Sequence, residues 1–116
     1  MEYTDSILDT IKKLLGPGQE QTHFDQDIII HINTAIMTLT DIGVGPKEGF
    51  SITSSAEVWS DFIEDIKKFE AVKTYIYLKV KLVFDPPLSS SVIEIYNKQI
   101  DEIEWRLNSM VDHPVV

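Results

Sequence analysis

The sequence predicts an all-α protein, built as a small bundle of four to five helices. Apolar residues recur at helical spacing in several separate segments of the chain. Ser or Asp residues that suit helix starts, and Gly or Pro residues that suit helix ends, flank these segments. No second strand-like segment matches the one ambiguous stretch, and an isolated strand leaves its backbone groups without hydrogen-bond partners.

The first predicted helix covers residues 4–15 and ends at Gly16-Pro17-Gly18. Its apolar face consists of Ile7, Leu8, Ile11, Leu14 and Leu15. The second predicted helix covers residues 26–42. Asp25 suits its N-cap, and Gly43 suits the left-handed position that follows a helix.

Residues 43–55 are predicted to form a turn-rich loop, because glycine and proline interrupt any regular pattern there. Ser54 and Glu57 then fit a capping box, so a third helix is predicted to begin near residue 56. Trp59 belongs to the apolar stripe of this helix and is expected in the core.

Residues 72–84 fit both an alternating strand pattern and a helical one, and the missing partner strand favours the helix. Asp85-Pro86-Pro87 must end it, because proline cannot continue the hydrogen-bond ladder. Ser91 and Glu94 form a second capping box that opens the final helix. We expect one domain over residues 1–116, with its core in about 4–110 and a mobile C-terminal tail at 111–116.

Composition narrows the classes of function. A chain of 116 residues with a net charge of −9 and a pI near 4.6 does not predict a surface that grips nucleic-acid phosphates. The absence of cysteine excludes disulfides and thiolate chemistry. The acidic start and the lack of a long apolar run predict no signal peptide and no membrane span. We therefore expect a protein made and used in the cytoplasm, or in an assembly formed there.

No pattern predicts catalysis, so we expect no catalytic residue, no metal and no cofactor. His23, Asp25 and Asp27 alternate, which suits a metal only in an extended segment, and both aspartates fit a helix start better. The glycines of residues 43–49 follow a helix, whereas a phosphate-binding loop follows a strand. The Gly-x-Ser-x-Gly nucleophile motif is absent.

Two groups of residues suggest contact with other proteins. Trp105 lies off the main stripe of the last helix beside Arg106, so it belongs either to an interface or to the edge of the core. The other group is a local positive patch in an acidic chain, either a solvated face or a partner for a neighbouring subunit's acids. It consists of Lys73, Lys79 and Lys81.

Short segments in a fixed order carry a further signal. They are Asp27-Ile28-Ile29, Ile32-Asn33, Ala35-Ile36, Ile42-Gly43-Val44-Gly45, Gly49-Phe50 with Ile52, Trp59 with Asp61, residues 72–80, residues 82–87 and residues 104–108. Together they resemble the small head-tail connector proteins of tailed bacteriophages. The resemblance covers about residues 25–108.

The resemblance implies an adaptor subunit, with no catalytic step, in which residues 72–84 are helical. Copies of it, twelve to match the portal, form a ring beneath the portal protein, extend the DNA channel and join the filled head to the tail. The remaining partners are a downstream tail-joining or stopper protein and genomic DNA that passes without specific binding. The subunit is made in the bacterial host cytoplasm and resides at the head-tail junction of the virion.

A closed ring needs two different, complementary patches on each subunit. The residues expected at protein interfaces are Gly43, Gly45, Phe50, Lys73, Lys79, Lys81, Asp85, Pro86, Pro87, Trp105, Arg106 and Asn108. Carboxylates on the loops or on a helix face are expected to line the channel and repel DNA phosphates. A cytoplasmic helical regulatory or protein-binding module remains an alternative, and a metal-dependent hydrolase that uses His23, Asp25 and Asp27 is a third reading.

Overall fold

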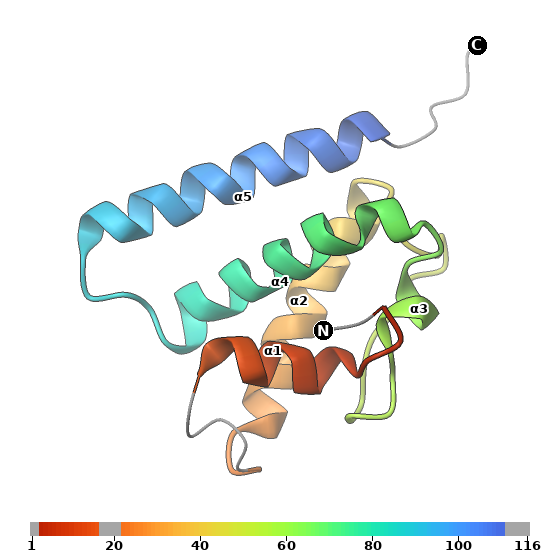
Figure 1. Cartoon of the computed structure of the whole chain (residues 1–116), viewed down its shortest axis with the longest axis horizontal. Helices are drawn as coiled ribbons and strands as arrows, with labels where there is room; N and C mark the ends of the chain where they lie inside the picture. Colours follow the sequence, from red (N-terminus) through yellow and green to blue (C-terminus); the bar gives the residue numbers. More distant parts are fainter. Residues whose placement is uncertain (1–2, 17–21, 111–116) are drawn as a thin grey trace.

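The computed structural model describes residues 3–16 and 22–110, and within them it confirms the all-α fold (Figure 1). Its elements are α1 (Ile7–Leu15), α2 (Asp25–Asp41), α3 (Trp59–Phe62), the 3-10 helix η1 (Ile66–Lys68), α4 (Phe69–Phe84) and α5 (Ser90–Met110). This part of the chain has no strand, only an isolated bridge between Ser6 and Val58. The predicted tail at 111–116 lies outside the described residues.

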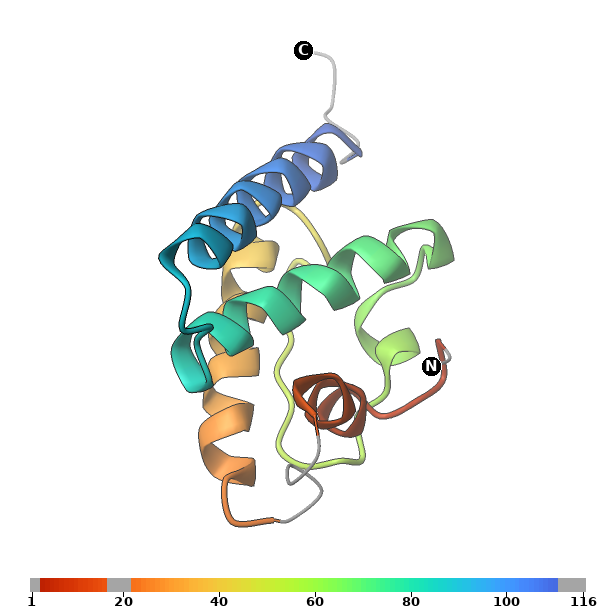
Figure 2. The same ribbon diagram turned by 60° about the vertical axis from the view of Figure 1, so that its left-hand side comes forward.

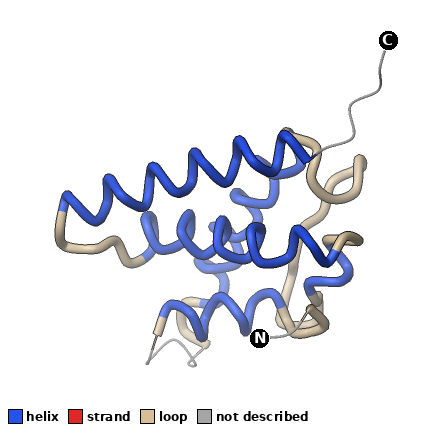
Figure 3. The backbone as a smooth tube through the Cα atoms, turned by 45° about the horizontal axis from the view of Figure 1, so that its top comes forward, coloured by secondary structure: helices blue, strands red, loops and turns tan. Residues whose placement is uncertain are grey.

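Helix α4 occupies the centre of the bundle and contacts α1, α2, α5 and η1. Helix α2 crosses behind α4, while α5 runs back along α4 in the opposite direction (Figures 1 and 2). The backbone tube shows α5 as the outermost helix, with the tan loops gathered at both ends of the bundle (Figure 3). This arrangement leaves one long side of α5 open to solvent.

The core lies where α1, α2 and α4 meet. Its fully buried side chains include Ile7, Ile11, Ile28, Ile32, Ile36, Leu39, Trp59, Phe62, Val72, Tyr75, Ile76 and Val80. The prediction that Trp59 is a core residue is therefore confirmed. Its indole N–H donates to the Thr10 hydroxyl at 3.1 Å, so the one polar group of this side chain has a buried partner.

The ends of α2 confirm one predicted cap and correct the other. The N–H groups of Gly43 and Val44 donate to the carbonyls of Thr40 and Leu39, and Gly43 has a φ of +97°, which together form a Schellman motif. Asp25, in contrast, is the first residue of the helix and not its N-cap. Its carboxylate instead lies 2.8 Å from the Lys12 ammonium, an ion pair that ties α2 to α1.

The single helix predicted from residue 56 is wrong. Glu57 does reach back to the N–H groups of Thr53 and Ser54, but this closes a turn and opens no helix. Helix α3 starts at Trp59 and ends at Phe62, after which Ile63 is extended. The reason is tertiary, because the backbone N–H groups of residues 7, 59 and 60 bond across to the carbonyls of residues 57, 5 and 3.

The predicted helix at 72–84 is confirmed, and α4 begins three residues earlier, at Phe69. It ends at Phe84, directly before Asp85-Pro86-Pro87, as predicted. Helix α5 begins at Ser90, and its N-terminal cap is the Ser89 hydroxyl, which accepts from the Val92 N–H at 3.4 Å. The predicted cap at Ser91 is thus two residues too late.

Candidate interaction surfaces

The loop between α2 and α3 is fixed to the core at several points. The Asn33 side chain of α2 makes two hydrogen bonds to one loop residue: its amide donates to the Ile52 carbonyl at 2.9 Å and its oxygen accepts from the Ile52 N–H at 2.8 Å. Phe50, an expected interface residue, stacks on Phe62 with 5.1 Å between ring centroids. Asn33 has no feature in the sequence that distinguishes it from any polar helix residue, except its place beside the buried Ile32.

Position 45 requires a glycine. Its φ is +87°, a conformation that costs other residues ~1–2 kcal/mol. A Cβ at this position would lie 2.4 Å from a ring carbon of Phe62, which is closer than atoms can approach. Gly49 also has a positive φ, but its Cβ position is open. Of these two glycines, only Gly45 is therefore needed for the close approach of the loop to Phe62.

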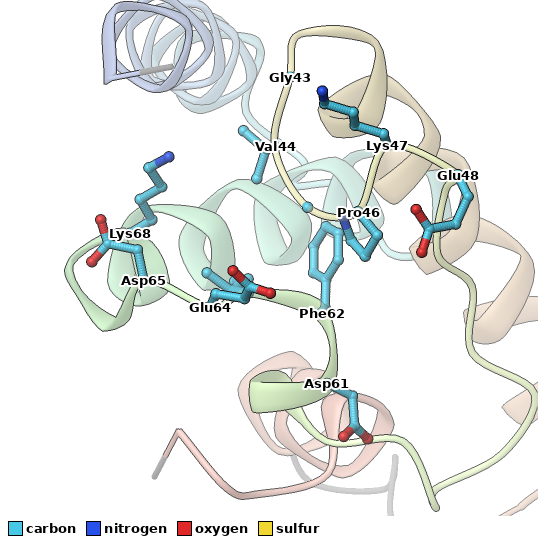
Figure 4. A pocket seen from close by; sticks show the side chains of 12 residues that line it. Gly43, Val44, Pro46, Lys47, Glu48, Asp61, Phe62, Glu64, Asp65 and Lys68 are labelled. Atoms are coloured by element: carbon cyan, nitrogen blue, oxygen red, sulfur yellow. The ribbon is translucent and has the colours of Figure 1, made fainter. Parts of the chain in front are cut away.

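A recess of about 490 Å³ separates this loop from the segment that follows α3. In Figure 4 the Phe62 ring stands beneath the loop next to Pro46, with Glu64 and Glu48 on either side. The lining charges are four acids against two lysines: Glu48, Asp61, Glu64 and Asp65 against Lys47 and Lys68. This is an acidic surface recess, suited to a polar or cationic side chain of a partner.

The positive patch predicted on α4 does not form as one surface. Lys79 points away from Lys73 and Lys81 around a helix with 3.6 residues per turn, and those two lysines lie two turns apart along it. Lys73 pairs with Glu70 at 2.8 Å, and Lys81 pairs with Asp85 at 2.8 Å. The hydrogen bond to the Asp85 carboxylate raises the pKa of Lys81.

Two of these lysines also contact aromatic rings: the Lys73 ammonium lies 5.0 Å from the centre of the Phe69 ring, and that of Lys79 lies 5.9 Å from the Tyr75 ring. Lys73 and Lys81 are thus paired with nearby acids, and Lys73 and Lys79 lie over aromatic rings, so the three lysines do not form a free basic surface.

Asp85, Pro86 and Pro87 form the connection between α4 and α5. Asp85 and Pro86 are exposed and Pro87 is half-buried. Leu88, the next residue, is fully exposed. The connection therefore presents an apolar residue to solvent at the end of the bundle where α4 stops.

Trp105 and Arg106 lie near the opposite end of the bundle, on the open side of α5. Trp105 is 71% exposed, which excludes the core alternative for this residue. The Arg106 guanidinium donates from Nε and Nη2 to one oxygen of Glu102, at 3.2 and 2.8 Å. Asn108 is also exposed. A large aromatic ring beside a guanidinium on a surface is typical of binding hot spots.

Helix α5 is attached to α4 by a seam with polar contacts. The Tyr75 hydroxyl of α4 donates to Glu104 of α5 at 2.6 Å. Burial, followed by the hydrogen bond and the charge of Glu104, raises the pKa of Tyr75 above its ordinary value of 10.0. Burial and the neighbouring Tyr96 likewise raise the pKa of Tyr77.

The three candidate metal ligands do not converge. Asp25 pairs with Lys12, and no group of three or more potential ligands, whether histidine or carboxylate, gathers in residues 3–16 and 22–110. Over the same residues, no helix is both long enough and apolar enough to cross a membrane.

The structure is thus a helical bundle with Trp105 and Arg106 exposed on α5 and an acidic recess beside the loop of residues 43–50. A sequence model of the phage connector proteins matches residues 7–114. The chain therefore belongs to the phage connector protein family, a family of phage structural proteins. Neither the curated proteins nor the solved structures contain a match to it.

Proposed function

We propose that this chain is a head-tail connector subunit. Twelve copies form a ring beneath the portal protein, extend the DNA channel and join the DNA-filled head to the tail. The observation that carries this proposal is the family match, which spans nearly the whole chain, from residue 7 to residue 114. The proposal places the protein at the head-tail junction of the virion, with no catalytic step of its own.

The surface of the subunit supports an assembled state. Nine large apolar side chains are exposed in the described part of the chain: Phe24, Ile30, Met37, Ile66, Val83, Leu88, Ile95, Trp105 and Met110. Single exposed apolar residues are ordinary, but these include a tryptophan and occur at both ends of the bundle. A ring subunit needs such residues on two separate surfaces, since its front contacts the back of its neighbour.

The acidic charge of the subunit supports a role in which genomic DNA passes close to the protein without binding to it. Asp61, Glu64 and Asp65 are exposed beside the recess, in a chain with a net charge of −9. Carboxylates that line a channel repel DNA phosphates over roughly a Debye length of 8 Å at physiological salt. We assign these three to the channel wall, and an assembled ring in which all of them point outward would refute this assignment.

The portal protein and a downstream tail-joining protein are the remaining partners. We assign the loop of residues 43–50 to the contact with one of them. This loop is already ordered by Asn33, Gly45 and Phe50, so docking there needs little further ordering.

Binding to isolated heads tests the proposal. Purified protein is mixed with DNA-filled, tail-less heads of the parent phage that carry the portal, and bound protein is measured after sedimentation. The proposal predicts saturation at one ring per head and restoration of tail attachment. Heads that lack the portal are the control and should bind none. Equal binding to both kinds of head, or no binding to either, would contradict a connector role.

A further inference from the structure

A second recess lies at the end of the bundle opposite Trp105, between the start of α2 and the end of α4. It has a volume of about 470 Å³ and is lined by Phe24, Asp27, His31, Val83, Phe84 and Asp85. We call it the α2–α4 groove. Phe24 and Phe84 pack edge to face, with 5.6 Å between ring centroids, and form its apolar part. Phe24 is 52% exposed and Val83 is 61% exposed, so this apolar surface is open to solvent.

The rim of the α2–α4 groove is acidic. Asp27 is exposed and has no ion-pair partner among the described residues, whereas Asp85 is paired with Lys81. Helix α2 contains no lysine or arginine. The groove therefore combines an apolar interior with an unpaired carboxylate, which suits a ligand that carries both an aromatic ring and a cation.

Trp105 and Arg106 have this complementary chemistry. Pockets of ~300–1,000 Å³ accommodate drug-sized ligands, which are larger than an indole ring. The α2–α4 groove, at about 470 Å³, therefore has room for the Trp105 side chain. Arg106 has five N–H donors, and the bonds to Glu102 use only two of them. The remaining donors are available for a second carboxylate.

The two surfaces cannot meet within one subunit. Helix α5 starts next to the end of α4 and runs away from it, so Trp105 lies ~22 Å along the helix axis from Ser90. In Figure 1 the end of α4 is at the left and the end of α5 at the upper right. Complementary patches at opposite ends of a molecule produce a head-to-tail contact, which closes into a ring when the rotation between copies allows it.

We propose that Trp105 and Arg106 of one copy dock into the α2–α4 groove of the next copy, with Arg106 paired to Asp27 of that copy. This proposal rests on the proposed connector function for its biological setting. The contact proposal identifies the two surfaces that meet between neighbouring subunits, which the formation of a ring does not by itself specify.

Cross-linking tests the contact directly, because the chain has no cysteine of its own. The full-length double variant Ser109→Cys and Val83→Cys places one thiol a turn from Trp105 and one in the groove. Within one copy these positions are ~27 Å apart along α5 and α4, beyond the reach of a disulfide or a short bismaleimide. A bismaleimide is added to concentrated protein and, separately, to protein bound to portal-bearing heads.

The expected result is a ladder of dimers, trimers and larger species, because a head-to-tail contact repeats. The matched control is Ser109→Cys with Ser55→Cys, an exposed loop position that does not line the groove, and it should give no ladder. Adding Trp105→Ala to the Ser109/Val83 pair should lower the yield of cross-linked species at least about tenfold, as for a binding hot spot. No ladder in either sample, or a ladder that stops at the dimer, would overturn the proposal.

Charge reversal tests the assigned ion pair. Arg106→Glu and Asp27→Arg, each alone, should reduce the ladder, and the two together in one chain should restore it. Failure of the double variant to recover would overturn the pairing. If the protein binds the heads but no ladder forms, this contact is wrong and the connector function stands. If a ladder forms in solution and the protein does not bind portal-bearing heads, the contact stands and the connector function is wrong.

Discussion

The loop of residues 43–50 and helix α5 differ in how closely they are packed into the fold, and their secondary structure does not show this difference. The loop is irregular, yet Asn33 clamps the chain just after it, Phe50 stacks on Phe62, and Gly45 fits against the same ring. Helix α5 has 21 residues, but only Ile100 and Leu107 are buried. The loop is thus an integral part of the fold, while most of α5 is surface. Regular structure and structural importance are separate properties in this protein.

Gly45→Ala should be the most damaging change to the loop. The new methyl group would collide with the Phe62 ring, and the left-handed backbone would disfavour alanine. We expect the free energy of unfolding to fall by ~2–5 kcal/mol, the sum of an overpacking cost and a backbone cost. Urea denaturation provides the measurement. Gly49→Ala is the matched control, since it has the same backbone cost without the collision, and an equal loss in both variants would contradict the packing argument.

Asn33→Ala should be the next most damaging. It leaves the N–H and the carbonyl of Ile52 without their side-chain partners, at a cost of ~1–3 kcal/mol. Asn33→Asp keeps the acceptor and loses the donor, so its loss in urea denaturation should be intermediate. If alanine at this position proved neutral, the loop would not depend on the clamp.

Tyr75→Phe weakens the attachment of α5 to α4. Removing the hydrogen bond to Glu104 should cost ~1 kcal/mol at neutral pH. The raised pKa also predicts a pH dependence. Above pH 10 the unfolded chain releases the Tyr75 proton while the folded chain retains it, so this residue's contribution to stability is complete below pH 10 and is lost as the pH rises further.

Thermal unfolding of both proteins between neutral and alkaline pH measures this effect. The wild-type protein should lose more stability above pH 10 than the Tyr75→Phe variant does. Tyr77, whose pKa is also raised, contributes to the loss of stability in both proteins. Parallel curves for the two proteins would show that the buried hydroxyl is not the source.

Trp105→Ala should have the smallest effect on folding. The side chain is 71% exposed, so the free energy of unfolding should change by no more than ~0.5 kcal/mol. The measurement is urea denaturation beside wild type. A loss comparable to that of Gly45→Ala would place Trp105 in the fold and would remove the distinction between α5 and the loop.

The sequence rules for helix ends and for apolar spacing correctly predicted the parts of the fold that depend on residues close together in the chain. Gly43 ends α2 as its position indicated, and Pro86 and Pro87 follow the end of α4. The spacing of the apolar residues around Trp59 correctly predicted that this side chain lies in the core. The helix at 72–84 was ambiguous by periodicity, and the missing partner strand favoured the correct answer.

Contacts between distant segments explain the errors. The backbone of residues 3–7 bonds to residues 57–60, which delays and shortens the third helix, and no local pattern shows this. Three consecutive serines offered equivalent caps for α5, and Ser89 is the one that is used. The α4 lysines were grouped as one positive patch because the acids that pair with Lys73 and Lys81, Glu70 and Asp85, were not considered as their partners. The α2–α4 groove was missed because its walls come from segments about 60 residues apart in the sequence.

The central claim is that α5 presents Trp105 for assembly and not for folding. The fraction of DNA-filled heads that acquire tails, in a phage whose connector carries Trp105→Ala, tests it most directly. The account predicts that full heads without tails accumulate while the variant remains folded and soluble at the wild-type level. Tail attachment at the wild-type level by the folded variant would contradict the claim.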